Sequence, residues 1–164
     1  AELGPRNEYG HTKLAGEQAV LEAVRSGQID AVVARAFKHA GPRQSTQLIP
    51  AEWAARLSHD RVIKVRSPES RIDLTDARDV VVAYRLLLEF GHCGEIYNVG
   101  SETSVRCGDL AQQLATLAGA TVEQGDQAPS PEPVANIDKL VALTGWRPRI
   151  PLEQTLRDTL DYYC

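Results

Sequence analysis

A near-continuous apolar run from Asp30 to Phe37 constrains the fold of this chain more than any other segment. Such runs are typical of strands buried on both faces of a parallel sheet, whereas half-solvated strands alternate apolar and polar residues. A helix predicted over residues 7–26 comes directly before the run and ends at Gly27. Further helices are predicted over 47–58, 79–90, 109–118, 136–144 and 152–162, and further strands over 62–65, 72–74 and 95–99. This alternation predicts an α/β fold with parallel strands, and the Pro-, Gly- and Ser-rich residues 124–133 predict a loop.

Tyr9 and Lys13 lie four residues apart near the start of the first predicted helix. Residues at this spacing share a helix face, so the phenol and the ammonium point into the same space. An ammonium close to a phenol favours the phenolate, which makes a tyrosine usable as a proton donor or acceptor near neutral pH. The pair is therefore a candidate acid/base site. A Tyr and a Lys at this spacing also occur on many helices without a catalytic role, and both interpretations stay open on the pair alone.

Five segments resemble, in order and spacing, the motifs of one enzyme family. They are residues 5–18 (PRNEYGHTKLAGEQ), 32–44 (VVARAFKHAGPRQ), 73–81 (DLTDARDVV), 94–101 (GEIYNVGS) and 139–156, which contains KL, TGWRP and PLEQTL. Together they are similar to the extended short-chain dehydrogenase/reductases of the NAD-dependent epimerase/dehydratase family, which act on nucleotide sugars. Within that family the similarity is greatest to the branch of the GDP-mannose 4,6-dehydratases and GDP-4-keto-6-deoxymannose reductases.

The resemblance implies a partial Rossmann-type fold, made of the last strands and helices of the parallel sheet, together with the small α/β substrate-binding domain. Residues 1–45 would be the remnant of the dinucleotide-binding domain and would carry the Tyr-x-x-x-Lys helix. Residues 46–164 would form mainly the substrate-binding domain, with residues 73–100 returning to the Rossmann sheet.

The printed sequence lacks the glycine-rich turn with which this family binds the cofactor pyrophosphate. Its twelve glycines nowhere form G-x-G-x-x-G or G-x-x-G-x-x-G after an apolar strand. The acidic residue that binds the ribose and the Ser or Thr of the family's catalytic triad are missing with it. We therefore expect a fragment, a truncated product or one half of a split enzyme. The resemblance implies NAD or NADP as the cofactor, and we expect that this chain alone does not bind it.

The resemblance assigns the catalytic roles to Tyr9 and Lys13. Tyr9 would exchange a proton with the sugar C4 oxygen while a hydride moves between C4 and the nicotinamide. Lys13 would bind the nicotinamide ribose, so both residues are also candidate cofactor contacts. Phe37 and His39 lie at the end of the apolar strand, where open α/β sheets bind ligands, and they complete the candidate cofactor site.

Lys38, Arg43 and Arg71 are the candidate substrate contacts, and the implied substrate is a nucleotide sugar of the GDP-mannose type. Lys38 stands where the family usually has Asn, and an ammonium attracts a diphosphate but accepts no hydrogen bond. Ile72 stands where the family commonly has an Arg for the nucleotide phosphates. Arg71 comes one position earlier and would point to the opposite face of its strand. For Arg35 and Arg43, a surface or structural ion pair is an equally good interpretation.

Composition and charge argue against several other classes of protein. A net charge of -4 and the spread of 18 Lys and Arg along the chain disfavour a nucleic-acid or membrane surface. No apolar run approaches the roughly 20 residues of a membrane span, and no secretory apolar segment is present, so we expect a cytoplasmic protein. Cys93, Cys107 and Cys164 have no metal-ligand spacing, which predicts reduced thiols and no metal site.

Two functions remain open. In the first, the chain is part of a nucleotide-sugar dehydratase or reductase that transfers a hydride at C4 and needs a missing N-terminal cofactor half. In the second, it is a non-catalytic truncated module that self-associates and binds no dinucleotide, so whether this chain alone is an enzyme stays open. A homo-oligomer is expected, because the Tyr-x-x-x-Lys helix contributes to a dimer interface in the family and truncation would uncover apolar surface around Val32 and Val33. Dehydratase, reductase and epimerase are not distinguished, and neither are NAD and NADP.

Overall fold

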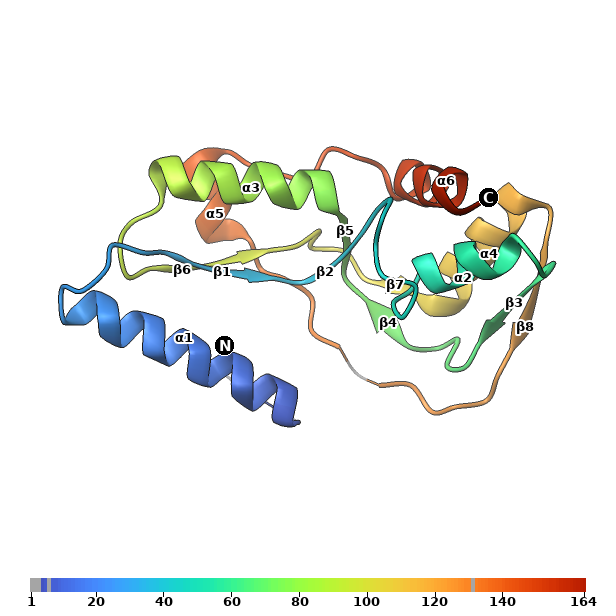
Figure 1. Ribbon diagram of the computed structural model, residues 1–164, viewed down its shortest axis with the longest axis horizontal. Coiled ribbons are helices and arrows are strands. Elements are labelled where there is room, and N and C mark those ends of the chain that lie inside the picture. The colour runs from blue at the N-terminus through green and yellow to red at the C-terminus, as the bar shows by residue number, and fades with distance from the viewer. Residues whose placement is uncertain (1–3, 6, 131) are drawn as a thin grey trace.

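The computed structural model describes residues 4, 5, 7–130 and 132–164 and has the predicted α/β class (Figure 1). Its helices are α1 (Glu8–Arg25), α2 (Ala51–Leu57), α3 (Ala77–Phe90), α4 (Cys107–Ala118), α5 (Asp138–Thr144) and α6 (Leu152–Tyr163). Its strands are β1 (Val33–Ala36), β2 (Lys38–Ala40), β3 (Val62–Val65), β4 (Arg71–Ile72), β5 (Leu74–Asp76), β6 (Ile96–Val99), β7 (Val105–Arg106) and β8 (Thr121–Gln124).

The strands pair two by two, and most of the pairs are parallel. β1 pairs with β6, β2 with β5 and β3 with β8 in parallel, whereas β4 and β7 are antiparallel. In Figure 1, α3 and α5 cover one side of the β1–β6 pair and α1 lies on the other side. At the other end of the molecule, α4 packs against β3 and β8, α2 packs against β3, and α6 packs against α2 and α4. Because β1 runs on directly into β2, this stretch connects the two ends.

Two clusters of buried apolar side chains form the core. One, called here the β6 core, consists of Val80, Ala83, Leu87, Tyr97, Val99, Ala135, Ile137, Leu140 and Trp146. The other, called the α4 core, consists of Ala40, Trp53, Ala54, Leu57, Ile63, Val65, Ile72, Leu74, Cys107, Leu110, Ala111, Leu114, Ala115, Leu156 and Leu160. Burial of these side chains is the main favourable contribution to folding. The predicted division at residue 45 stays a prediction.

Helix α1 differs from the other long helices because none of its 18 residues is buried. Its first turn is capped by Asn7, whose Oδ1 accepts a hydrogen bond from the Gly10 amide at 2.8 Å. Its last turn is followed by Gly27, which has a positive φ of 72°. The helix predicted over residues 7–26 is therefore confirmed, but its burial resembles that of a surface element.

Three local predictions are corrected. The predicted strand 72–74 is two strands, because β4 pairs antiparallel with β7 whereas β5 pairs in parallel with β2, and Asp73 lies between them. The predicted strand 30–37 is shorter, and β2 continues it with a different pairing partner. The predicted helix 47–58 begins after Pro50, as expected for a residue that has no amide hydrogen to donate. Within the described residues, no helix has the length and apolar character needed to cross a bilayer.

Candidate active site

Tyr9 and Lys13 lie on the first turns of α1 and contact each other. The Lys13 Nζ lies 5.3 Å from the centroid of the Tyr9 ring, a distance at which an ammonium is attracted to an aromatic ring. Tyr9 is 71% exposed, so its phenol is accessible from outside the chain. The arrangement places a cation beside an accessible phenol, which is the chemistry needed to exchange a proton with a bound ligand.

A cavity of about 270 Å³ opens beside Lys13, between α1 and β1. It is lined by Gly4, Pro5, Gly10, Lys13, Leu14, Glu17 and Arg35. The Arg35 Nε and NH2 groups donate to the Glu17 Oε2 and Oε1 atoms at 2.7 and 2.6 Å. Glu17 and Arg35 therefore neutralise each other, and Lys13 is the remaining charged residue in the lining of this cavity.

A wider depression of about 450 Å³ lies beside α2, away from these residues. It is lined by Thr46, Glu52, Ala55, Arg56, His59 and Asp60, none of which is a predicted site residue. The cavity beside Lys13, in contrast, is lined by a predicted site residue. We therefore take the cavity beside Lys13 as the relevant one.

Phe37, Lys38 and His39 lie where β1 passes into β2. The Phe37 amide donates to the Val99 oxygen at 2.9 Å, and its half-buried side chain packs against the β6 core. His39 is exposed, and its Nδ1 lies 3.1 Å from the Phe37 oxygen. Lys38 is also exposed, with its Nζ 3.0 Å from the Glu132 Oε1. An anion that approached Lys38 would therefore compete with Glu132.

Arg43 and Arg71 lie on separate segments. Arg43 is exposed in the turn after β2 and has a positive φ of 69°. The Arg71 Nε and NH2 groups donate to the Oγ and the backbone oxygen of Ser104 at 2.9 and 2.6 Å. Ile72 is buried whereas Arg71 is exposed, as expected for adjacent residues that point to opposite strand faces.

The predicted site residues thus fall into separate groups. Tyr9 and Lys13 contact each other, and His39 contacts Phe37. Among the described residues, no hydrogen bond or ion pair joins either group to the other, to Arg43 or to Arg71.

Comparison with known proteins identifies the family. Residues 1–100 match the model of the NAD dependent epimerase/dehydratase family. The chain belongs to this family. The GDP-6-deoxy-D-mannose reductase of Pseudomonas aeruginosa is 30% identical over 168 residues, which cover 95% of this chain and 55% of the relative. The dTDP-D-glucose 4,6-dehydratase of Mus musculus is 26% identical over 171 residues, which cover 97% of this chain and 48% of the relative. The chain therefore spans about half the length of these curated relatives.

Solved structures of the epimerase/dehydratase family share the fold. The structure of RMD from Pseudomonas aeruginosa complexed with NADPH matches with a TM-score of 0.88 and 30% identity, and the match covers 98% of this chain and 56% of that one. A dTDP-glucose 4,6-dehydratase from Bacillus anthracis in complex with NAD matches with a TM-score of 0.84 at 22% identity, covering 99% and 53%. These matches confirm the predicted family and the predicted partial Rossmann-type fold class.

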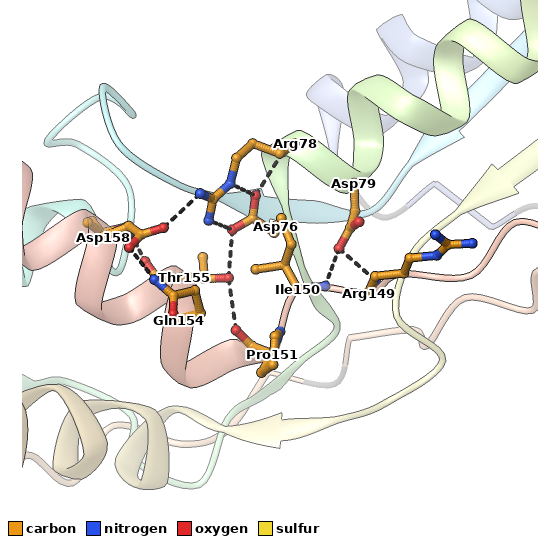
Figure 2. A network of polar contacts seen from close by, with 10 residues as sticks. Asp76, Arg78, Asp79, Arg149, Ile150, Pro151, Gln154, Thr155 and Asp158 are labelled. Carbon is orange, nitrogen blue, oxygen red and sulfur yellow. Dashed lines mark hydrogen bonds and ion pairs between the residues drawn. The ribbon is translucent and has the colours of Figure 1, made fainter.

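Sequence reasoning missed the roles of the carboxylates in the DLTDARD motif, two of which, Asp76 and Asp79, are shown at the start of α3 in Figure 2. Asp76 accepts hydrogen bonds from the Arg78 amide and Nε at 2.8 and 2.9 Å, and from the Thr155 hydroxyl at 2.8 Å. Burial raises the pKa of Asp76, but the hydrogen bonds from Arg78 and Thr155 outweigh burial and hold it below 3.8. Asp76 therefore caps α3 as a carboxylate and ties it to α6.

Asp79 and Asp73 have comparable roles. The Asp79 Oδ2 accepts hydrogen bonds from the amides of Arg149 and Ile150, both at 2.9 Å (Figure 2). Asp73 accepts from the Ser101 amide at 2.8 Å and from the Ala135 amide at 2.9 Å. Three acidic residues interspersed with Leu74, Val80 and Val81 were a usable signal for buried acceptors, because buried carboxylates need hydrogen-bond donors.

Proposed function

We propose that the chain supplies the acid/base and sugar-side half of a nucleotide-sugar reductase or dehydratase of the GDP-6-deoxymannose or GDP-mannose type. The observation that carries this proposal is the contact between Tyr9 and Lys13 on an accessible face of α1. The 30% identity to a GDP-6-deoxy-D-mannose reductase supports the choice of sugar nucleotide.

Only one end of the dinucleotide fits the residues of this chain. Lys13 and the Tyr9 hydroxyl suit the nicotinamide ribose, since an ammonium and a phenol can hydrogen-bond to its hydroxyls. A glycine-rich turn for the pyrophosphate is not present in the printed sequence. We therefore propose that the pyrophosphate is held by a polypeptide segment outside this sequence.

In the proposed reaction the bound nicotinamide supplies or accepts the hydride at sugar C4. In the reducing direction, Tyr9 donates its phenolic proton to the C4 oxygen as the ketone becomes an alcohol. In the oxidising direction, the Tyr9 phenolate accepts that proton. Lys13 holds the Tyr9 oxygen and the ribose in place and stabilises the phenolate by its charge.

We propose that Phe37 and His39, where β1 passes into β2, border the nicotinamide. We also propose that Lys38, Arg43 and Arg71 contact the diphosphate of the nucleotide sugar. Lys38 and Arg71 already have partners, Glu132 and Ser104, so substrate binding would exchange these contacts for phosphate oxygens. Charge-assisted hydrogen bonds to phosphate are stronger than neutral ones, which favours the exchange at Arg71.

The test combines this chain with the N-terminal portion of the Pseudomonas aeruginosa reductase, the part of that relative that the alignment leaves uncovered. We expect the pair to reduce the GDP-4-keto-6-deoxymannose substrate with NADPH. Tyr9→Phe should lower turnover by about 100-fold or more while GDP-sugar binding by calorimetry stays unchanged, since the change removes one acid/base group.

Tyr84→Phe is the matched control, because Tyr84 is another exposed tyrosine but lies on α3. It should leave turnover unchanged. Equal turnover in Tyr9→Phe and Tyr84→Phe would refute the catalytic role of Tyr9.

We propose as the alternative a non-catalytic module that self-associates. Three observations favour association: α1 buries none of its residues, β1 has β6 as its one strand partner among the described residues, and α3 exposes Val81 and Leu88. Unpaired strand edges and exposed apolar faces are typical of interaction surfaces. An assembled chain that binds neither dinucleotide nor GDP-mannose in calorimetry would favour this function.

A further inference from the structure

The apolar side chains of α1 are at most half-buried, so apolar burial alone holds this helix only weakly against the rest of the molecule. Its 18 residues include none that is buried, although the helix carries the candidate acid/base pair. Helix stability in proteins comes chiefly from packing of an apolar face, so a helix with so little packing needs another anchor. The question is what fixes the position of this helix against the β1–β6 pair.

An ion pair between Glu17 of α1 and Arg35 of β1 provides such an anchor. It is bidentate, with Arg35 Nε donating to Glu17 Oε2 at 2.7 Å and NH2 donating to Oε1 at 2.6 Å. The Glu17 side chain is 11% exposed and that of Arg35 is 31% exposed, so the pair is largely shielded from water. The hydrogen bonds from Arg35 to Glu17 raise the pKa of the guanidinium despite the opposing effect of burial, so the guanidinium is charged.

Parallel fork-to-fork hydrogen bonds define direction as well as distance. A single apolar contact would let α1 slide or rotate, whereas two bonds from one planar guanidinium to one carboxylate hold the helix in one register. By contrast, the Glu22–Arg25 pair lies on α1 alone, with both side chains about two-thirds exposed. It can support the helix locally but cannot fix it to the sheet.

The directions of the two elements connect this anchor to the candidate site. In Figure 1, α1 and the β1–β2 stretch run in opposite directions. Tyr9 precedes Glu17 by eight residues, which corresponds to about 12 Å along a helix. His39 follows Arg35 by four residues, which corresponds to about 13 Å along an extended strand. Both paths therefore lead from the ion pair in the same direction, toward the place where β1 passes into β2, over similar distances.

We propose that Glu17 and Arg35 are positioning residues that fix the distance of Tyr9 and Lys13 from the end of the β1–β2 stretch. The proposal rests on the proposed function for its relevance to catalysis. The position of α1 relative to β1 can be measured without cofactor or turnover. Glu17 acts through α1 and Arg35 through β1, and neither is required to touch the substrate.

The test measures the distance between the two elements in the 164-residue chain. Nitroxide labels are attached to His11→Cys and His39→Cys, both at exposed positions, in a chain in which the exposed Cys93 and Cys164 are replaced by Ser. Pulsed electron paramagnetic resonance then reports the distribution of distances between α1 and β2. We expect one narrow distribution in the parent chain.

Glu17→Gln should broaden this distribution at least twofold, because it removes the charge that pairs with Arg35. The charge reversal Glu17→Arg with Arg35→Glu should restore the narrow distribution. Glu22→Gln is the matched control on the same helix and should leave the distribution narrow. An unchanged distribution in Glu17→Gln, or equal broadening in Glu17→Gln and Glu22→Gln, would overturn the proposal.

Hydrogen exchange distinguishes a local loosening of α1 from a general loss of stability. In Glu17→Gln, amides of α1 should exchange about tenfold faster while amides of β6 and α3 keep their rates, because the anchor acts locally. Equal acceleration in all three elements would mean that the pair is a general stabiliser, which also overturns the proposal. If Tyr9→Phe leaves turnover intact but the distance results hold, the proposed function fails while the anchor stands.

Discussion

The segments that carry Asp73, Ser101 and Ala135 meet at a junction that is packed too closely to accept one additional atom. Asp73 is buried, and within the part of the chain that the structure describes no cation pairs with it; its carboxylate accepts hydrogen bonds from two different segments, at Ser101 and at Ala135. Gly100 lies in the same junction: a Cβ at this position would lie 2.5 Å from the Ala135 Cβ and 3.0 Å from the Asp73 Oδ2. Neither neighbour can move without breaking the hydrogen bonds of Asp73.

Gly100→Ala should therefore destabilise the chain by about 1–3 kcal/mol, the usual cost of overpacking a close contact. Gly16→Ala is the control, because Gly16 lies on the exposed face of α1 with no atom within 4 Å of an added Cβ. That change should stabilise by about 0.5–1 kcal/mol through helix propensity. Urea unfolding of the three proteins measures both effects, and a Gly100→Ala chain as stable as the parent would contradict this account of the junction.

At the scale of elements, the start of α3 depends on the ionised form of Asp76. Its hydrogen bonds with Arg78 and Thr155 exist with the carboxylate charged and join α3 to α6. Because its folded pKa lies below the usual 3.8, the unfolded chain binds the proton more readily than the folded chain does. The stabilisation is complete well above the unfolded pKa and is lost as pH falls through the folded value.

We expect the free energy of unfolding to fall as pH is lowered from about 5 to about 3, and Asp76→Asn to flatten this dependence. Asp126→Asn is the control, because Asp126 lies in an exposed segment. Chemical denaturation at a series of pH values gives the slopes. A steep dependence that survives in Asp76→Asn would assign the effect to other carboxylates.

Element prediction from sequence worked where local pattern determines structure. The helix that became α1 followed from an apolar periodicity ended by Gly27. Strand β2 did not follow, because Lys38 and His39 lie beyond the apolar run and the strand forms by pairing with the distant β5. The Glu17–Arg35 pair joins residues 18 positions apart, so only the docked helix brings them together. Tyr9 and Lys13 were identifiable because their contact is local to one helix.

At the scale of the whole molecule, the exposed apolar surface predicts association. Val81 and Leu88 on the outer face of α3 are 64% and 85% exposed. Their burial in an assembly removes apolar area from water, which favours association. We expect the chain to sediment as a dimer or larger species, and Val81→Lys with Leu88→Lys to shift it toward monomer.

Leu48→Lys is the control for this shift, since Leu48 is also more than half exposed but lies before α2. It should leave the sedimentation profile unchanged. A chain that remains monomeric at all concentrations would contradict self-association, and an equal shift in both variants would remove α3 from the interface.

The two cores alternate along the chain. The α4 core draws first on residues 40–74, the β6 core on 80–99, the α4 core again on 107–115, the β6 core on 135–146, and the α4 core finally on 156–160. No single cut in the sequence therefore separates one core from the other. Recombination at one crossover point would join mismatched halves of both cores. Exchange of a contiguous block with a relative would accordingly place new residues in both cores at once, whereas a point substitution changes the packing of one.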